Sequence, residues 1–260
     1  MITLVPVSPA SAMLLAAGRG ERMRPLTDTC PKPLLAVQGK PLMQWHLEAL
    51  QRGDCQRVVV NTDWLGQQIV AQFGDQFLPE TTSDQPGLAL RYSHEGRDFG
   101  GALETAGGIV RALPLLGEVF WVLAADVFTP GFEFSQAALD RFAASGMLAH
   151  LWLVPNPPHN PGGDFGLQTA ADAAGALALN LSKDDPRPRY TFSTIALYRC
   201  ALFEPPWCDI AAGNPNGIKA PLAPLLRRAM NNRQVSAELY YGAWTDVGTP
   251  QRLAQLNAGK

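Results

Sequence analysis

Residues 13–35, MLLAAGRGERMRPLTDTCPKPLL, constrain the fold of this chain more than any other stretch. An apolar run, 13–17, ends abruptly in Gly18-Arg19-Gly20. The side chains that follow include the cations Arg22, Arg24 and Lys32, the last between Pro31 and Pro33. Glycine lets backbone N–H groups approach an anion, and arginine and lysine supply charge-assisted hydrogen bonds. The stretch therefore predicts a buried strand that ends in a phosphate-binding turn.

Two common phosphate motifs do not match this turn. A Walker A loop would end in Gly-Lys-Ser/Thr, which is missing here. A dinucleotide fingerprint would need glycine at Met23, and Pro25 would interrupt its helix. An ordinary tight turn stays open as an alternative, but the length of the string and its cations favour a nucleotide site.

The first half alternates between strand-like and helix-like segments. Strands are expected at 13–17, 57–61, 88–92 and 119–125, and helices at 41–52, at 63–73 with Asp63 as cap, and at 104–113. Repeated strand-helix-strand order implies parallel crossovers. We therefore predict an α/β fold with a doubly wound, mostly parallel but mixed, Rossmann-like sheet that carries helices on both faces.

The second half is less regular. Its expected segments are a helix from a Ser135 cap to Gly146, a strand at 147–154, a Pro/Gly-rich loop at 155–166, a strand pair at 177–181 and 190–198, a helix at 221–230, a strand at 235–244 and a helix at 249–257. We expect one domain over residues 1–260, with this half laid over the carboxyl edge of the sheet.

Bulk properties exclude several classes of protein. The net charge of −2 gives no general basic field, so we expect no nucleic-acid partner. The longest apolar run, 119–125, is too short to cross a bilayer, so we expect no membrane partner. Residues 1–11 lack the features of a secretory signal and are expected to form a disordered leader. The 4 cysteines form no CxxC pair, which favours a reduced, cytoplasmic setting.

Two aspartates follow predicted strands. Asp126 comes directly after 119–125, and Asp246 follows Trp244-Thr245. In open α/β sheets, ligands lie beyond the carboxyl ends of the strands. Because Mg²⁺ accepts few carboxylates together with water and substrate phosphate oxygens, the pair predicts a magnesium site. The alternative is that each aspartate simply caps the next turn or helix.

With these motifs in place, the chain resembles the sugar-1-phosphate nucleotidyltransferases. LLAAGRGERMRPLTDTCPKPLLAV is similar to the opening motif of that family, and further matches are LETAGGI at 103–109, LAAD at 123–126 and WTDVGTP at 244–250. Within the family, NTDWLGQQI, RYSHEG, the segment 163–165, the segment 191–193 and APLLRRAM most resemble uridylyltransferases that act on N-acetylmuramate 1-phosphate.

The resemblance implies a Mg²⁺-dependent reaction. A nucleoside triphosphate, UTP by this likeness, and a sugar 1-phosphate would give a nucleotide sugar and pyrophosphate, in the recycling of peptidoglycan sugars. Residues 12–130 would form the nucleotide-binding half and 131–260 the sugar-phosphate-binding half. The short chain also implies a monomer or a small homo-oligomer.

The resemblance also assigns roles to residues. The residues with expected catalytic roles are Arg24, Lys32 and Asp126, of which Arg24 would face the leaving pyrophosphate. The nucleotide-binding group is Ala17, Gly18, Gly20, Glu21, Arg22, Lys32, Glu95, Gly96, Thr105 and Gly107. The sugar-phosphate group is Asp164 and Lys183, and the metal ligands are Asp126 and Asp246. For Lys183, a solvated loop lysine is an equally good interpretation.

Some positions depart from the family pattern. Ala124-Ala125 replace Asn-Gly before the metal aspartate, 97–102 is longer than usual, and Ser193-Thr194-Ile195 stands where Ser-Gly-Ile is common, which would crowd the sugar pocket. Two alternatives remain open. One is a uridylyl-, thymidylyl- or guanylyltransferase acting on glucose or mannose 1-phosphate. The other is a catalytically inactive nucleotide-sugar sensor.

Overall fold

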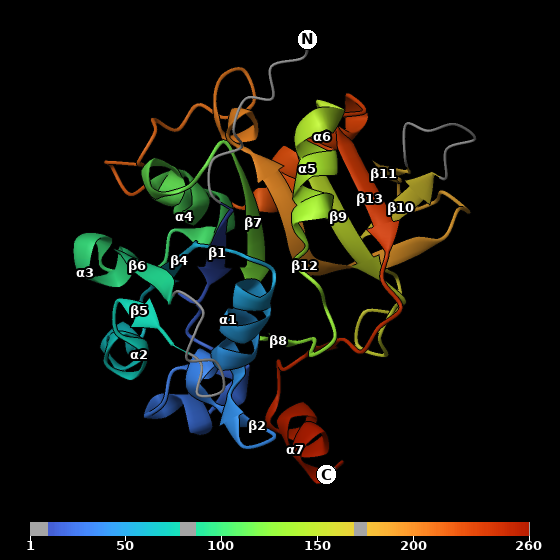
Figure 1. The fold of residues 1–260 in the computed structure, drawn as a ribbon. Coiled ribbons are helices and arrows are strands. Elements are labelled where there is room, and N and C mark those ends of the chain that lie inside the picture. The colour runs from blue at the N-terminus through green and yellow to red at the C-terminus, as the bar shows by residue number, and fades with distance from the viewer. Residues whose placement is uncertain (1–9, 79–86, 169–175, 260) are drawn as a thin grey trace.

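The computed structural model describes residues 10–78, 87–168 and 176–259. Its central feature is a ten-stranded mixed sheet with the order β10-β11-β13-β9-β12-β7-β1-β4-β6-β5 (Figure 1). The strands of this sheet are β1 (Ser11–Leu15), β4 (Arg57–Thr62), β5 (Gln76–Phe77), β6 (Leu88–His94), β7 (Val119–Ala124), β9 (Ala149–Val154), β10 (Phe165–Gln168), β11 (Leu177–Leu179), β12 (Arg189–Arg199) and β13 (Val235–Leu239).

The middle of the sheet is parallel. Strand β1 pairs in parallel with β4 and with β7, and β4 pairs in parallel with β6. Beyond β7 the directions mix, since β12 is antiparallel to β7 and β9 while β13 is parallel to β9. The strands of the second half thus extend the sheet, and the expectation that they lie over its carboxyl edge is wrong.

Helices cover both faces, as predicted. They are α1 (Leu42–Arg52), α2 (Gly66–Phe73), α3 (Glu95–Phe99), α4 (Glu104–Ala112), α5 (Gln136–Ser145), α6 (Leu222–Asn231) and α7 (Pro250–Ala258). Leu14 of β1 belongs to the core cluster that includes residues of α1 and α5, whereas Met13 belongs to the cluster with α4 and α6. This alternation is what a strand buried on both faces requires.

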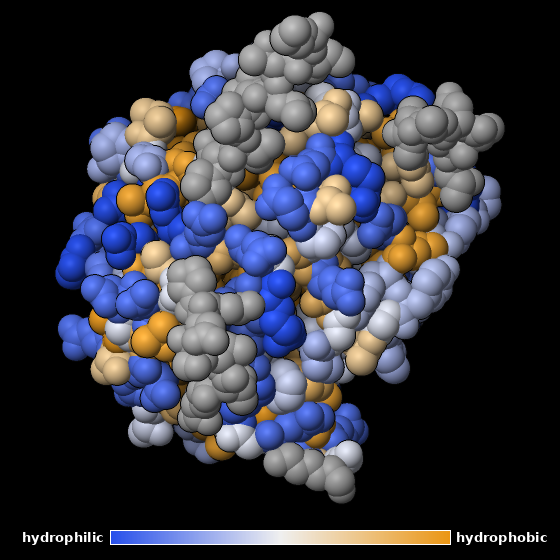
Figure 2. Space-filling view, viewed as in Figure 1, coloured by the Kyte–Doolittle hydropathy of each residue, from blue (hydrophilic) through white to orange (hydrophobic). Residues whose placement is uncertain are grey.

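Helix α5 shows how local sequence sets these boundaries. The Ser135 hydroxyl accepts the N–H of Ala138 at 3.3 Å, and the helix ends before Gly146, whose φ is 70°. The predicted cap and stop are therefore confirmed. Leu139 and Phe142 face the core, and hydrophilic side chains gather over the outer side of α5 (Figure 2).

A small two-stranded ladder joins residues 245–246, near the C-terminus, to the segment that follows β7. Strand β8 (Val127–Phe128) follows β7 and pairs with β14 (Thr245–Asp246). Beside it, β2 (Ala36–Val37) and β3 (Lys40–Pro41) pair with each other, and α7 packs against β2. A third core cluster, which includes Met23, Leu42, Val247 and Leu253, holds these pieces together.

Several predicted boundaries need correction. Helix α2 begins at Gly66, and Asp63 does not cap it but accepts the N–H of Ala102 at 3.1 Å. The strands near 177–181 and 190–198 do not pair directly. Strand β10, part of which was expected to be loop, pairs with both of them.

The predicted strand at 235–244 ends at Leu239, before β14. Of the expected leader, residues 1–9 lie outside the described residues, whereas Ser11 already belongs to β1. Within the described ranges, no helix has the length and apolar character of a membrane span.

Candidate active site

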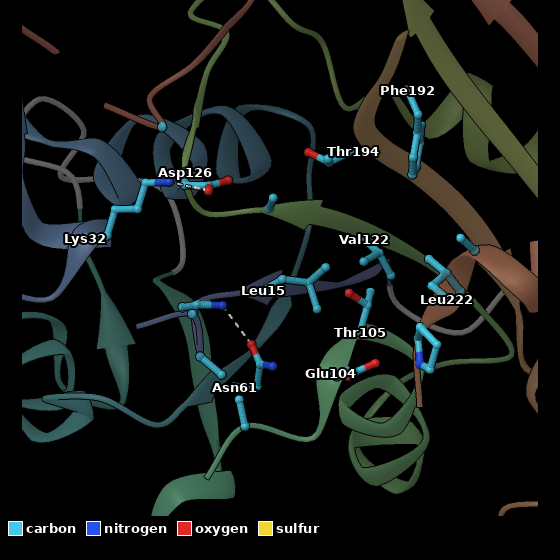
Figure 3. Close-up of a pocket in the computed structure, with 18 of the residues that line it drawn as sticks. Leu15, Lys32, Asn61, Glu104, Thr105, Val122, Asp126, Phe192, Thr194 and Leu222 are labelled. Atoms are coloured by element: carbon cyan, nitrogen blue, oxygen red, sulfur yellow. Dashed lines mark hydrogen bonds and ion pairs between the residues drawn. The ribbon is translucent and has the colours of Figure 1, made fainter. Parts of the chain in front are cut away.

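A pocket of about 820 Å³ lies beyond the carboxyl ends of β1, β4 and β7. The glycine turn, the start of α4, β12 and α6 contribute its walls (Figure 3). Ten of the predicted site residues line it: Ala17, Gly18, Gly20, Glu21, Arg22, Lys32, Glu95, Thr105, Asp126 and Asp164. Residues far apart in the sequence therefore meet in one cavity.

The glycine turn is fixed from both sides. The N–H of Ala16 donates to the Asn61 side chain at 2.7 Å, and the Thr27 hydroxyl donates to the Gly20 carbonyl at 2.9 Å. Gly20 has a φ of 68°, which glycine adopts without strain, and a short 3-10 helix, Glu21–Met23, follows it. A Cβ at Gly18 would meet nothing within 4 Å. The open backbone at Gly18 suits an approaching anion.

Lys32 and Asp126 form an ion pair inside the pocket. The Lys32 ammonium donates to a carboxylate oxygen of Asp126 at 2.5 Å, and the Lys32 side chain is 9% exposed. Pro31 and Pro33 restrict the backbone that carries the lysine. A fixed cation thus stands where β7 ends, next to the glycine turn (Figure 3).

The pairing of β14 with β8 places the backbone of Asp246 next to that of Asp126. Asp246 pairs with Val127, and the N–H of Val247 donates to the Asp126 carbonyl at 2.9 Å. The Asp246 carboxylate accepts a bond from Arg252 at 2.7 Å and lies 3.4 Å from a ring nitrogen of His159. The two backbones are therefore neighbours, while each carboxylate has its own cationic partner.

Among the residues predicted to bind the nucleotide, Glu95 makes its hydrogen bonds to other residues of the protein. It is fully buried and accepts bonds from Asn61 Nδ2 and from the N–H of Leu103, both at 2.8 Å. Burial raises the pKa of this carboxyl group. Glu95 thus links the end of β4 to Leu103, the residue before α4. Thr105, in the first turn of α4, lines the pocket.

Gly96 and Gly107 do not line the pocket. A Cβ at Gly96 would lie 2.2 Å from the Asp63 carboxylate, and one at Gly107 would lie 2.4 Å from the Ile218 carbonyl. Both glycines allow close packing of the segments around the cavity. Their assignment to the nucleotide stays a prediction.

On the side predicted for the sugar, Asp164 lines the pocket beside Phe165 and Phe192. Its carboxylate accepts the N–H of Phe192 at 2.8 Å. Lys183 is exposed in a loop and Arg24 is exposed with an Asp28 partner at 2.7 Å, and neither lines the pocket. The roles predicted for these two cations stay predictions.

Sequence reasoning did not assign several pocket residues. Arg227 of α6, Thr194 and Tyr198 of β12, and Asn61 of β4 all line the cavity. The family resemblance had placed Thr194 near the sugar pocket without giving it a role, whereas the place of Arg227, within the APLLRRAM motif, depends on tertiary packing. Within the described chain, the buried hydroxyls of Thr194 and Tyr198 have no hydrogen-bond partner.

Comparison with known proteins identifies the class. Residues 11–259 match the family model described as "Nucleotidyl transferase", so the chain belongs to the nucleotidyltransferase family. The resemblance to this family in the sequence motifs is confirmed.

Two relatives that match nearly the whole chain share one name. An N-acetylmuramate alpha-1-phosphate uridylyltransferase of Neisseria meningitidis serogroup B is 43% identical over 95% of this chain and 96% of the relative. A protein of the same name from Caulobacter vibrioides is 38% identical over 94% of each chain. Both agree with the subfamily likeness of the motifs.

The fold also matches a solved structure from Bacillus anthracis, described as a glucose-1-phosphate thymidylyltransferase in complex with sucrose. The TM-score is 0.70, with 96% of this chain and 94% of that chain covered. At 17% identity, this likeness concerns the fold alone.

Proposed function

We propose that this protein transfers the uridylyl group of UTP to N-acetylmuramate 1-phosphate. The products are the UDP-sugar and pyrophosphate, a reaction that serves the recycling of peptidoglycan sugars. The Lys32–Asp126 pair carries the proposal, because it places a fixed cation and a carboxylate in the same cavity as the glycine turn. The two full-length relatives support the choice of substrates.

The chemistry is an in-line displacement. An oxygen of the sugar 1-phosphate attacks the α-phosphorus of UTP, a new P–O bond forms, and the bond to the β-phosphate oxygen breaks. Such a step depends on positioning and charge neutralisation more than on covalent help. Gly18, Gly20 and Arg22 would hold the triphosphate, and Lys32 would neutralise charge at the α-phosphate.

The residues around Asp126 and Asp246 fit a Mg²⁺ ion. The described residues include no cluster of three or more His, Cys, Asp or Glu side chains able to hold a metal. Mg²⁺ needs less than that, since two carboxylates with water and phosphate oxygens satisfy its preference for hard oxygen ligands. Asp126, in the turn just before β8, and Asp246, in the β14 strand that pairs with β8, would hold the ion. When bound, Mg²⁺ supplies charge neutralisation to the triphosphate and the sugar phosphate.

Arg227 favours an acidic sugar. N-acetylmuramate carries a lactyl carboxylate that glucose, mannose and N-acetylglucosamine lack. Arg227 lines the pocket from α6, and in the described structure its guanidinium has no hydrogen bond or ion pair. A free cation on this wall matches the additional carboxylate.

A pyrophosphate-release assay tests the proposal. The purified protein is supplied with Mg²⁺, and UTP, dTTP, GTP, CTP and ATP are crossed with N-acetylmuramate, N-acetylglucosamine, glucose and mannose 1-phosphates. We expect the highest kcat/KM for UTP with N-acetylmuramate 1-phosphate, and no turnover by Asp126→Asn. Preference for a neutral hexose phosphate would overturn the substrate assignment, and inactivity with every pair would favour the sensor.

A further inference from the structure

The backbone at Thr194 is in an unusual conformation. Its φ is 68°, in the left-handed region that β-branched residues rarely adopt. The residue lies in β12 where the pairing with β9 shifts register, between Phe192 and Ala196. Strained residues cluster at active sites and ligand clamps, where the surrounding structure holds them in place.

Neighbouring side chains hold this conformation in place. The buried Ser193 hydroxyl donates to the Trp152 carbonyl at 2.6 Å and accepts the N–H of Ile195 at 3.1 Å. The indole of Trp244 donates to the Ser193 carbonyl at 3.0 Å. Because these bonds fix the residues on either side, Thr194 cannot relax without breaking them.

The Thr194 side chain has no partner within the described protein. It lines the pocket, and its hydroxyl oxygen is buried without a hydrogen bond (Figure 3). An unpaired buried hydroxyl lowers stability, and so does the strained backbone. Since neither feature helps the protein fold, both point to a group that arrives from outside.

We propose that Thr194 is a specificity-determining residue for the sugar 1-phosphate. Its hydroxyl donates a hydrogen bond to an oxygen of that substrate, and its methyl group limits the space beside the sugar. This inference rests on the proposed function. Thr194 lies in β12 two residues from Phe192, and the N–H of Phe192 donates to Asp164, which also lines the pocket. Since Asp164 is the residue predicted to bind the sugar 1-phosphate, we assign the Thr194 contact to that substrate.

Three substitutions of Thr194 distinguish the effect of its hydroxyl group from the effect of its strained backbone. Thr194→Val keeps the shape and the strain but removes the hydroxyl. We expect it to raise the KM for the sugar 1-phosphate roughly tenfold, as the loss of one hydrogen bond implies, with the KM for UTP unchanged. Thr194→Ser, which keeps the hydroxyl, should restore a KM close to that of the wild type.

Thr194→Gly tests the strain. Glycine adopts positive φ freely, so the unfolding temperature should rise while the KM for the sugar 1-phosphate also rises. A purely structural role would change only the unfolding temperature. A wild-type KM in Thr194→Val, or an increase confined to UTP, would overturn the inference.

The wild-type protein, assayed in parallel, tests the proposed function separately. If the substrate panel selects another sugar 1-phosphate, the three variants are measured with that sugar. The proposed substrate would then fail, while the role of Thr194 would still be decided by its own variants.

Discussion

Lys32 depends on its surroundings for its position. A lysine is rarely buried without an anionic partner, because removing an ammonium group from water is costly. Here Asp126 provides the partner at 2.5 Å, and two prolines restrict the backbone. On the proposed function, the same ammonium group would turn from Asp126 to the substrate phosphates, since the lysine side chain is long and flexible.

Removal of this charge tests the assignment. Lys32→Ala should lower kcat by roughly 10²- to 10³-fold, as expected for loss of a charged contact to the transition state. Steady-state pyrophosphate release measures the change. Lys40→Ala is the matched control, since Lys40 pairs with Glu48 outside the pocket and its loss should leave kcat nearly unchanged. Equal effects of the two substitutions would remove Lys32 from the mechanism.

Arg227 allows a similar test of sugar selectivity. Arg227→Ala should raise the KM for N-acetylmuramate 1-phosphate roughly tenfold and leave the KM for N-acetylglucosamine 1-phosphate nearly unchanged. The next residue, Arg228, lies over the Trp207 ring away from the pocket, so Arg228→Ala is the control. Equal losses with both sugars would show that Arg227 binds their common phosphate instead.

At the scale of elements, the turn after β1 combines a fixed backbone with open space. Gly18 lines the pocket and has room for a Cβ, so a methyl group there need not disturb the fold. On the proposed function, that methyl group would nevertheless stand where backbone N–H groups approach a phosphate. Function and stability can therefore be separated at this position.

Gly18→Ala makes this separation measurable. We expect the unfolding temperature to stay within a few degrees of the wild type while the KM for UTP rises about tenfold or more. Gly162 also has open space around it but does not line the pocket, so Gly162→Ala is the control. Unchanged UTP kinetics in Gly18→Ala would mean that the triphosphate lies elsewhere.

Helix α1 is linked to β8 by a buried histidine. A ring nitrogen of His46 bonds the Val127 carbonyl at 2.8 Å, and burial lowers the pKa of His46 to about 4. Because a carbonyl can only accept, this nitrogen carries a hydrogen, and the low pKa keeps the ring neutral at pH 7. The link supports the segment that joins Asp126 to the β8–β14 ladder.

The low pKa predicts how stability changes with pH. Well above pH 6.5 the ring is neutral in both states, and as the pH falls toward 4 mainly the unfolded chain takes up the proton. His46 should therefore cost about 3 kcal/mol of unfolding free energy between pH 7 and pH 4. Denaturant unfolding of the wild type and His46→Gln measures this term, and identical pH dependence in the two would contradict it.

Local sequence predicted the central elements well and the outer ones less well. Val58–Val60 and the Ser135 cap carry their signals within a few residues, so β4 and α5 were foreseen. Strand β10 forms because Gly166 pairs with β11 on one side and β12 on the other, and no pattern in the neighbouring sequence predicts this pairing. Asp63 likewise has a cap-like position but bonds a loop 39 residues away.

At the scale of the whole molecule, the pocket joins both halves of the chain. The glycine turn, Lys32 and Asp126 come from the first half, while Asp164, Thr194 and Arg227 come from the second. The motif residues could be placed from the sequence because they follow predicted strands. Thr194 was expected beside the sugar from the family resemblance alone. Arg227 could not be placed, because only the packing of α6 against the sheet brings it to the cavity.

A crystal structure of the protein with a non-hydrolysable UTP analogue, Mg²⁺ and N-acetylmuramate 1-phosphate tests the central claim most directly. We predict the triphosphate against the Gly18–Arg22 turn, one Mg²⁺ between Asp126 and Asp246, and the sugar between Asp164 and Thr194. A nucleotide bound outside this pocket, or a metal that touches neither aspartate, would contradict the account.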